Sequence, residues 1–398
     1  MQPSVRPSGC PLPDRRPTMN ERSSNLPRID AEEILEGIRE WVAIESPTSS
    51  AAGVNAMMDA AQERLKALNL GVERIPGRDG YGDLVKARTP WGGDEPGILV
   101  LCHLDTVHPI GTLGRNSFRR EGDIVYGPGI YDMKGGAFIA LYALQHLIRQ
   151  GKESRLPVTI LYVSEEEVGS PISRAVIEAE AKKAKYVLVT EPAREGGKIV
   201  TARKGVARFK MTATGRPAHS GSRHQDGRSA IREIARQILT IEGMTDYERG
   251  VTTNCGMVSG GTAVNVVPAS CTVEIDARLP DAETAKEVVA AILNLKPHDP
   301  DVELVVEGEL NRPPFEKSEG ISALFEHARR CAAEAGIDLQ DLKTGGGSDG
   351  NFTAALGVPT LDGLGVDGKG GHTEYEQIYY SSLEPRTKMW VRLYETLA

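Results

Sequence analysis

The chain has 398 residues and a formal net charge of -8 at pH 7, a length that suits about two domains. Hydrophobic residues make up 40% and charged residues 26%, which excludes collagen-like, coiled-coil and wholly disordered classes. Because phosphate binding needs clustered cations, we expect no nucleic-acid partner. The sequence has no apolar run of about 18 residues, so we also expect no membrane partner.

The five cysteines are scattered and form no C-x-x-C pair, a pattern typical of free thiols in a reducing compartment. Residues 1–28 are rich in Pro, Ser and Arg, and they contain no apolar stretch of the kind that a secretion signal needs. We expect this segment to be a disordered tail, with Met19 as an alternative start. Both features favour a cytoplasmic protein.

From residue 29 onward the chain alternates between continuous apolar runs and amphipathic segments. They span residues 98–102, 135–149, 158–163, 174–183 and 186–190. Buried strands separated by helices indicate a mostly parallel sheet that is covered on both faces. We therefore predict an α/β catalytic domain whose first part spans residues 29–204.

From about residue 205 the pattern changes to alternating strands around two helical segments, 229–239 and 282–293. A β-α-β-β-α-β order of this kind is typical of a ferredoxin-like fold. We predict an inserted α+β domain over residues 205–312, after which the catalytic domain resumes over residues 313–398.

Polar side chains follow the apolar runs, at the edge where open α/β sheets bind their ligands. His103 and Asp105 follow the first run, Glu165–Glu167 the second and Glu191 the third. A carboxylate beside an imidazole fixes its tautomer, as in many metal-binding histidines. Adjacent carboxylates repel one another unless a cation offsets their charge.

Two glycine-rich loops add a carboxylate, Asp132, and a second imidazole, His372. Each feature alone has an ordinary explanation: a hydrogen-bonded strand-end histidine, a loop aspartate before a helix, or a solvated acidic run. Together, two imidazoles and several carboxylates suit a pair of divalent transition ions, with zinc as the first expectation. Glu166 is then a candidate general base.

From about residue 29 to its end the sequence resembles the M20 metallopeptidases, within them the glutamate carboxypeptidase (carboxypeptidase G2-like) and aminoacylase branch. The motifs are H-x-D, G-x-x-D-M-K-G, E-E-x-x-G-S, E-P, and G-G-G-S-D before G-H. The resemblance implies a zinc-exopeptidase-like catalytic domain with an inserted lid that dimerises. It also implies two Zn²⁺ per chain, with Co²⁺ or Mn²⁺ as alternatives.

The resemblance further implies how the metal ligands divide between the two ions. His103 and Glu191 would hold one ion, Glu167 and His372 the other, and Asp132 would bridge them. The peptide bond after Asp132 would be cis.

Two groups gain catalytic roles from the resemblance, and Asp105 gains a supporting one. Glu166 would be the general base, and Asp105 would orient His103. His219 in the inserted domain would reach the active site of the partner in a homodimer and stabilise the oxyanion. Simple solvent exposure is the alternative explanation for His219.

Substrate contacts also follow from the resemblance. Arg312 would bind the substrate carboxylate, with help from the backbone of Gly346 and Gly347, and Asn265 would lie near the substrate. The alternative for Arg312 is a structural role at the domain hinge. Glu191, where aminopeptidases of the family tend to have Asp, favours cleavage of an N-acyl amino acid.

We therefore expect a dinuclear zinc hydrolase that cleaves an amide bond next to a free carboxylate and releases a C-terminal amino acid, as a glutamate-type carboxypeptidase does. Its substrate would be a small N-acyl amino acid or peptide. An aminoacylase, an amino-acid conjugate amidohydrolase or a deaminase could use the same site. A catalytically silent binding protein is a further alternative, against which the full ligand set with Glu166 argues.

Overall fold

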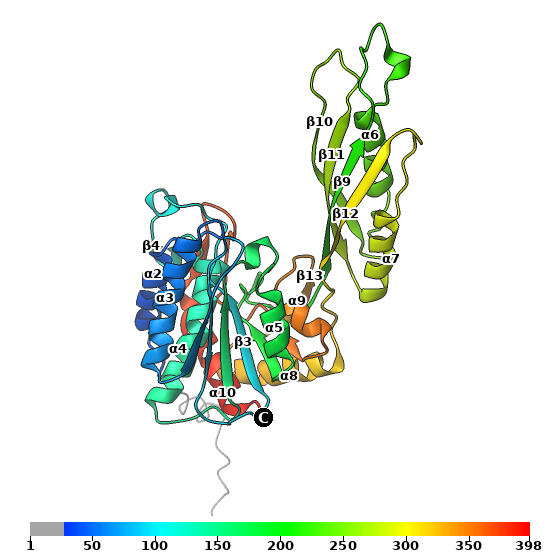
Figure 1. Cartoon of the computed structure of the whole chain (residues 1–398). Helices are drawn as coiled ribbons and strands as arrows, with labels where there is room; N and C mark the ends of the chain where they lie inside the picture. The colour runs from blue at the N-terminus through cyan, green and yellow to red at the C-terminus, as the bar shows by residue number, and fades with distance from the viewer. Residues whose placement is uncertain (1–27) are drawn as a thin grey trace, which may run out of the picture.

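The computed structural model describes residues 28–398 and shows a larger part with a central sheet and a smaller part that stands away from it (Figure 1). The tail predicted over residues 1–28 lies outside the described residues, apart from Arg28. The central sheet has six strands, in the spatial order β1 (Gly71–Ile75), β2 (Leu84–Arg88), β6 (Val158–Val163), β3 (Gly97–His103), β7 (Ala184–Val189) and β14 (Thr360–Leu361). The strands from β6 to β14 are parallel, and β2 joins β6 in antiparallel pairing.

Helices cover both faces of this sheet because its strands are apolar on both sides. In β3, Ile98, Val100 and Cys102 belong to one buried cluster, whereas Leu99 and Leu101 belong to another. The first cluster includes side chains of α2 (Ala31–Val42), α3 (Ala51–Ala67), α4 (Gly135–Arg149), α8 (Glu319–Glu334) and α10 (Leu383–Thr396). The second includes side chains of α5 (Arg174–Ala181) and α9 (Gly350–Ala355). The predicted α/β sandwich is confirmed.

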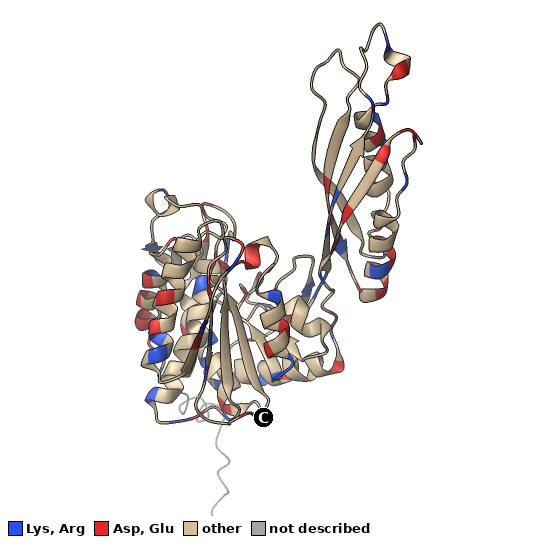
Figure 2. Cartoon of the chain, in the orientation of Figure 1, with Lys and Arg blue, Asp and Glu red and all other residues tan. Residues whose placement is uncertain are grey.

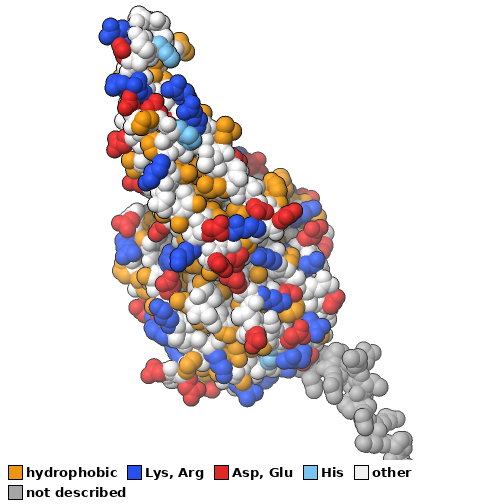
Figure 3. All heavy atoms as spheres, turned by 90° about the vertical axis from the view of Figure 1, so that its right-hand side faces the viewer, with side chains coloured by type: hydrophobic (Ala, Val, Ile, Leu, Met, Phe, Trp, Pro, Cys, Tyr) orange, Lys and Arg blue, Asp and Glu red, His pale blue; other side chains and the backbone are white. Residues whose placement is uncertain are grey.

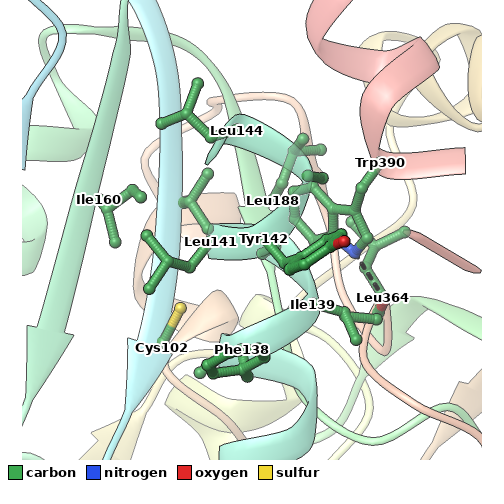
Figure 4. Close-up of a cluster of buried hydrophobic side chains, with 14 of the residues drawn as sticks. Cys102, Phe138, Ile139, Leu141, Tyr142, Leu144, Ile160, Leu188, Leu364 and Trp390 are labelled. Atoms are coloured by element: carbon green, nitrogen blue, oxygen red, sulfur yellow. Dashed lines mark hydrogen bonds between the residues drawn. The ribbon is translucent and has the colours of Figure 1, made fainter. Parts of the chain in front are cut away.

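Helix α4 lies directly against the sheet. Figure 4 shows Phe138 and Leu141 of this helix beside Cys102 of β3 and Ile160 of β6. Its residues from Gly135 to Leu144 are all buried, so α4 is the inner helix of this face.

Two small sheets extend the catalytic part. In one, β16 (Gln377–Tyr379) lies between β15 (Gly368–Lys369) and β5 (Ile124–Tyr126), and β5 also pairs with β4 (Arg119–Glu121). In the other, β8 (Ile199–Arg203) pairs with β13 (Asp341–Thr344). The first of these sheets ties a late segment of the chain to the segment that precedes α4.

The smaller part has the predicted β-α-β-β-α-β order. Its elements are β9 (Gly205–Thr214), α6 (Ala230–Glu242), β10 (Thr252–Gly260), β11 (Ser270–Leu279), α7 (Ala282–Leu293) and β12 (Glu303–Arg312). The strands form an antiparallel sheet in the order β10-β11-β9-β12, which packs its own apolar core against the two helices. An inserted ferredoxin-like unit is therefore present, and we keep residues 29–204, 205–312 and 313–398 as the proposed domain boundaries.

Charges of both signs are interspersed over the catalytic part and the inserted unit (Figure 2). Among residues 28–398, we find no helix with both the length and the apolar character needed to cross a membrane.

The start of α4 approaches the end of β7 closely because Gly136 has no side chain. A Cβ atom at Gly136 would lie 2.1 Å from the carbonyl oxygen of Thr190 and 2.9 Å from Cα of Gly365. Both are backbone atoms, so neither can rotate away. Gly136 therefore lets α4 sit against the segment that leads from β7 to Glu191.

We expect Gly136→Ala to lower the free energy of unfolding by about 3 kcal/mol, the upper end of the cost of overpacking. The loss should appear even though alanine favours helices more than glycine does. Gly114→Ala is the control, because a Cβ there would meet no atom within 4 Å. Urea denaturation measures both variants, and equal stability of the two would contradict this account of α4 packing.

Candidate active site

Six of the predicted site residues converge at the carboxyl edge of the central sheet. One is the last residue of β3, and the loops after the neighbouring strands β6 and β7, the turn before α4 and the loop between β15 and β16 carry the others. The residues are His103, Asp132, Glu166, Glu167, Glu191 and His372.

Asp132 lies between two groups of potential metal ligands. Its Oδ1 is 3.2 Å from Nε2 of His103, which is itself 3.8 Å from Oε1 of Glu191. Its Oδ2 is 3.2 Å from Nε2 of His372, which is 3.2 Å from Oε2 of Glu167. Within each group the atoms that could bind an ion lie within 4.8 Å of one another. The peptide bond between Asp132 and Met133 is cis.

Asp105 fixes the orientation of His103 by contacting Nδ1, the ring nitrogen that does not face Asp132. Nδ1 of His103 lies 3.0 Å from the carbonyl oxygen and 3.4 Å from Oδ1 of Asp105. Nδ1 therefore keeps its proton, and Nε2 is the nitrogen that can bind a cation once it is deprotonated. The Asp105 carboxylate is held by the hydroxyl of Thr48 at 2.7 Å and by the backbone N–H groups of Glu166 and Glu167.

The electrostatics of both groups favour a bound cation. Burial raises the pKa of Glu191 to about 8 and also raises the pKa of Glu167. Hydrogen bonds to Asp132 and Glu167 raise the pKa of His372 to about 11. These carboxylates therefore ionise easily only beside a positive charge, which the two imidazoles supply here.

One oxygen at the site lacks a partner. Oε1 of Glu167 is buried, and no hydrogen-bond donor among residues 28–398 reaches it. A buried carboxylate oxygen of this kind is costly unless something binds it. The nitrogen and oxygen donors around Asp132 are also the types that zinc and similar divalent ions prefer. The residues present therefore fit two such ions.

Glu166 is next to a potential ligand but belongs to neither group. Its Oε1 lies 2.8 Å from the guanidinium of Arg312. Burial raises the pKa of Glu166 well above its usual range, and Arg312 opposes this shift. Glu166 lines the pocket above the two groups, so its carboxylate can meet a bound molecule.

Arg312 is buried and already paired on both arms. One arm donates to Asp349 at 2.7 Å, and the other donates to Glu166 at 2.8 Å and to the hydroxyl of Ser170 at 3.3 Å. Gly347 allows this arrangement, since a Cβ there would lie 2.8 Å from Cδ of Arg312. The structure places the predicted carboxylate-binding residue at the pocket, but in contact with two acidic residues.

The pocket has a volume of about 310 Å³ and lies where the base of the inserted unit meets the catalytic part. Gly346 and Gly347 line it, as do Arg194, Arg208 and Arg278 in addition to Arg312. Sequence reasoning missed Arg194 and Arg208. Arg194 comes two residues after the E-P motif, and this closeness to a predicted site residue could have identified it. Arg208 has no such signal, because it is one of several polar residues in an alternating strand.

The structure does not bring His219 and Asn265 to this pocket. His219 lies in the connection from β9 to α6 and Asn265 in the connection from β10 to β11, and the N–H of Ser220 donates to the carbonyl oxygen of Asn265 at 3.0 Å. Both connections are at the end of the inserted unit that is far from the catalytic part (Figure 1). Nδ1 of His219 accepts N–H groups of Gly221 and Ser222 at 3.1 and 3.2 Å. The proton of a neutral imidazole is therefore on Nε2, which makes Nε2 the donor.

Sequence reasoning also missed two buried residues, Glu376 and His108. Nε2 of His108 lies 2.5 Å from Oε2 of Glu376, and the same carboxylate contacts the backbone around Asp132. Glu376 follows His372 by four residues, but nothing in the sequence singled it out.

The sequence is related to known peptidases. The sequence model of peptidase family M20/M25/M40 matches residues 99–396 of this chain. Carboxypeptidase G2 of Pseudomonas sp. (strain RS-16) is 32% identical over 368 residues, which cover 90% of this chain and 88% of that protein.

The fold is also that of solved peptidases. A tripeptidase from Staphylococcus aureus superposes with a TM-score of 0.75 at 22% identity, over 92% of this chain and 98% of the other. An M20 family metallo-carboxypeptidase from Sulfolobus solfataricus gives a TM-score of 0.71 at 20% identity, over 92% and 99% of the two chains. With these folds and the residues around Asp132, the family match shows that the chain belongs to peptidase family M20/M25/M40 and is a metal-dependent hydrolase related to carboxypeptidases.

Proposed function

We propose that the protein is a dinuclear zinc hydrolase that cleaves an amide bond next to a free carboxylate and releases a C-terminal amino acid, as a glutamate-type carboxypeptidase. The observation that carries this proposal is the place of Asp132, one oxygen of which faces His103 and the other His372. Asp132 and Glu191 would bind one ion with His103, and Asp132 and Glu167 the other with His372. Co²⁺ and Mn²⁺ accept the same donors and are the alternatives to zinc.

Glu166 would move the proton in this reaction. When bound, two divalent ions would polarise the amide carbonyl and lower the pKa of the attacking water. Glu166 accepts a proton from the attacking water and passes it to the leaving nitrogen. The burial that raises the pKa of Glu166 supports this role, because the group must hold the proton between the two steps. Asp105 orients His103 throughout.

The arginines of the pocket support a substrate with a free carboxylate. We place the carboxylate at Arg312, whose planar fork suits a two-oxygen contact. Because Arg312 already pairs with Glu166 and Asp349, a substrate would have to replace or share one of these contacts. Gly346 and Gly347 line the same pocket, and their backbone N–H groups would help to bind the carboxylate. A structural role of Arg312 at the hinge is the alternative that the test below separates.

A homodimer formed through the inserted unit would bring His219 and Asn265 to an active site. Strand β10 is one of the two edge strands of its sheet, and it exposes 61% of Met257 and 60% of Val258. Apolar side chains lie among charged ones over the surface of this unit (Figure 3). An apolar sheet edge supports pairing with a second copy. His219 would then donate from Nε2 to the developing oxyanion of the partner's site.

Other hydrolytic activities remain candidates on the same site. An aminoacylase, a conjugate amidohydrolase or a deaminase would use the same ions and Glu166, with a different acyl group or leaving group. The 32% identity to carboxypeptidase G2 favours carboxypeptidase activity over these alternatives. A catalytically silent binding protein would not need a general base such as Glu166.

The cysteines of the described residues, which are free thiols, support a location in the cytoplasm.

The zinc-loaded protein should release glutamate from N-acylglutamates and should lose this activity with a chelator. Amidation of the substrate's α-carboxylate should lower kcat/KM at least about 100-fold, because a neutral amide cannot replace or share the carboxylate contacts that Arg312 already makes with Glu166 and Asp349. Arg312→Ala should remove most of this discrimination, with the exposed Arg329→Ala as the control.

If Arg312→Ala lowers kcat/KM equally for the acid and for the amide substrate, Arg312 does not bind the carboxylate. A structural role at the hinge predicts this result. If no N-acyl amino acid in a broad panel is hydrolysed, the carboxypeptidase proposal is wrong.

Zinc binding to the metal-free protein at pH 7 should release protons. The pKa values of His372, about 11, and of Glu191, about 8, both lie above 7, so both groups hold protons that a cation must displace. The affinity for zinc should therefore rise with pH between 6 and 8. Calorimetry in two buffers with different ionisation enthalpies measures the release. His372→Asn should release fewer protons than the wild type, and heats that do not depend on the buffer would argue against protonated ligands.

Mixing two inactive variants tests the dimer. Glu166→Gln and His219→Ala should each be inactive, since each lacks a group that the reaction needs. In a mixed dimer, one site takes both defects and the other is complete, so equal mixing should restore about a quarter of the wild-type activity. Subunit exchange is checked by mass spectrometry of differently tagged chains. No recovery after proven exchange would mean that His219 does not act on the partner's site.

A further inference from the structure

Glu376 is a fully buried carboxylate that gathers the backbone of the loop carrying Asp132. Its Oε1 accepts the N–H groups of Tyr131 and Asp132, both at 2.8 Å. Its Oε2 accepts the N–H of Gly129 at 2.9 Å and lies 2.5 Å from Nε2 of His108. One side chain therefore satisfies three backbone donors within four residues.

These donors need an acceptor from elsewhere because the loop is not a regular helix. Gly129 has a left-handed backbone, with φ of 70°, and Asp132 has φ and ψ of -116° and 94°. The N–H groups of this turn converge on one point instead of pointing to earlier carbonyl groups of a helix. Three N–H groups of the turn meet the one Glu376 side chain at 2.8 to 2.9 Å, so Glu376 determines where the turn, and Asp132 with it, is placed.

The same segment also carries His372. Glu376 follows His372 by four residues, and Gln377, the next residue, pairs with Tyr126 of β5 just before the loop of Asp132. The carbonyl oxygen of Glu376 accepts the N–H of Gly127 at 3.3 Å. The loop of His372 and the loop of Asp132 are thus joined at both the backbone and the side chain of Glu376.

We propose that Glu376, supported by His108, is a positioning residue that sets the distance between Asp132 and His372 and so determines the affinity of the ion between them. The inference rests on the proposed two-ion site. The first group has His103 and Glu191 at the ends of the adjacent strands β3 and β7, so it depends on Glu376 only through Asp132. The second group depends on both loops that Glu376 joins.

Glu376→Gln keeps the size of the side chain but presents an NH₂ group to backbone N–H donors, so part of the contact must break. We expect the ion at Asp132, Glu167 and His372 to bind about 10–100-fold more weakly, as is usual when a residue that orients a metal ligand is changed. The ion at His103 and Glu191 should change much less. The matched control is Glu374→Gln, whose exposed side chain lies on the same loop.

The measurement is calorimetric titration of the metal-free protein with Zn²⁺ in the presence of a competing chelator, with elemental analysis of dialysed samples. Wild type and Glu374→Gln should bind two ions per chain, and Glu376→Gln should retain one under limiting zinc. The melting temperature of each metal-free variant is recorded separately, because a merely structural role would lower it without changing the ratio of the two affinities.

His108→Leu is the second variant, and it removes one of the four contacts while leaving the backbone donors in place. It should weaken the same ion by a smaller factor, and it carries the test if Glu376→Gln does not fold. If the wild type binds two ions and each folded variant binds both with unchanged relative affinities, the positioning role is wrong while the two-ion proposal stands. If the wild type itself does not bind two ions, both are wrong.

Discussion

Mutual repulsion among buried carboxylates is the constraint on which this site depends. Asp132 lies within reach of Glu191 on one side and of Glu167 on the other, at the edge of the sheet, where taking a charge out of water costs several kcal/mol unless it is paired. His103 and His372 supply the balancing charge in this structure, each within 3.2 Å of Asp132. Two cations, one bound between each imidazole and the facing oxygen of Asp132, would supply the same balance. The remaining architecture holds these acidic groups together against their repulsion.

The fold meets this constraint with backbone groups as much as with side chains. The strand order β6-β3-β7 brings three strand ends next to one another, and each end leads into a loop with one or two site residues. Gly136 lets α4 approach the segment after β7, and the turn before α4 places Asp132 above the ends of these strands. Behind the site, Asp105 accepts N–H groups of the β6 loop, and Glu376 accepts those of the Asp132 loop. The Asp105 carboxylate thus positions the loop that carries Glu166 and Glu167, and the Glu376 carboxylate positions the loop that carries Asp132.

The sequence predicted the catalytic sheet and the metal-ligand candidates because both depend on local patterns. Continuous apolar runs mark β3, β6 and β7, and polar residues directly after them must lie at one edge of a parallel sheet. Strand β10 has no such local signal, since most of its residues are exposed and leave no alternation. The pairing of Arg312 with Asp349, 37 positions away, and of His108 with Glu376, 268 positions away, depends on the three-dimensional fold and has no local signal. The distance of His219 from the pocket likewise depends on how the inserted unit stands relative to the catalytic part.

The central claim is that Asp132 is shared between two bound ions. The most direct measurement is a crystal structure of the zinc-loaded protein with anomalous data collected on both sides of the zinc absorption edge. The account predicts two anomalous peaks, one beside His103 and Glu191 and one beside Glu167 and His372, with an oxygen of Asp132 bound to each. A single peak at full zinc loading, or two peaks of which one has no contact with Asp132, would contradict it.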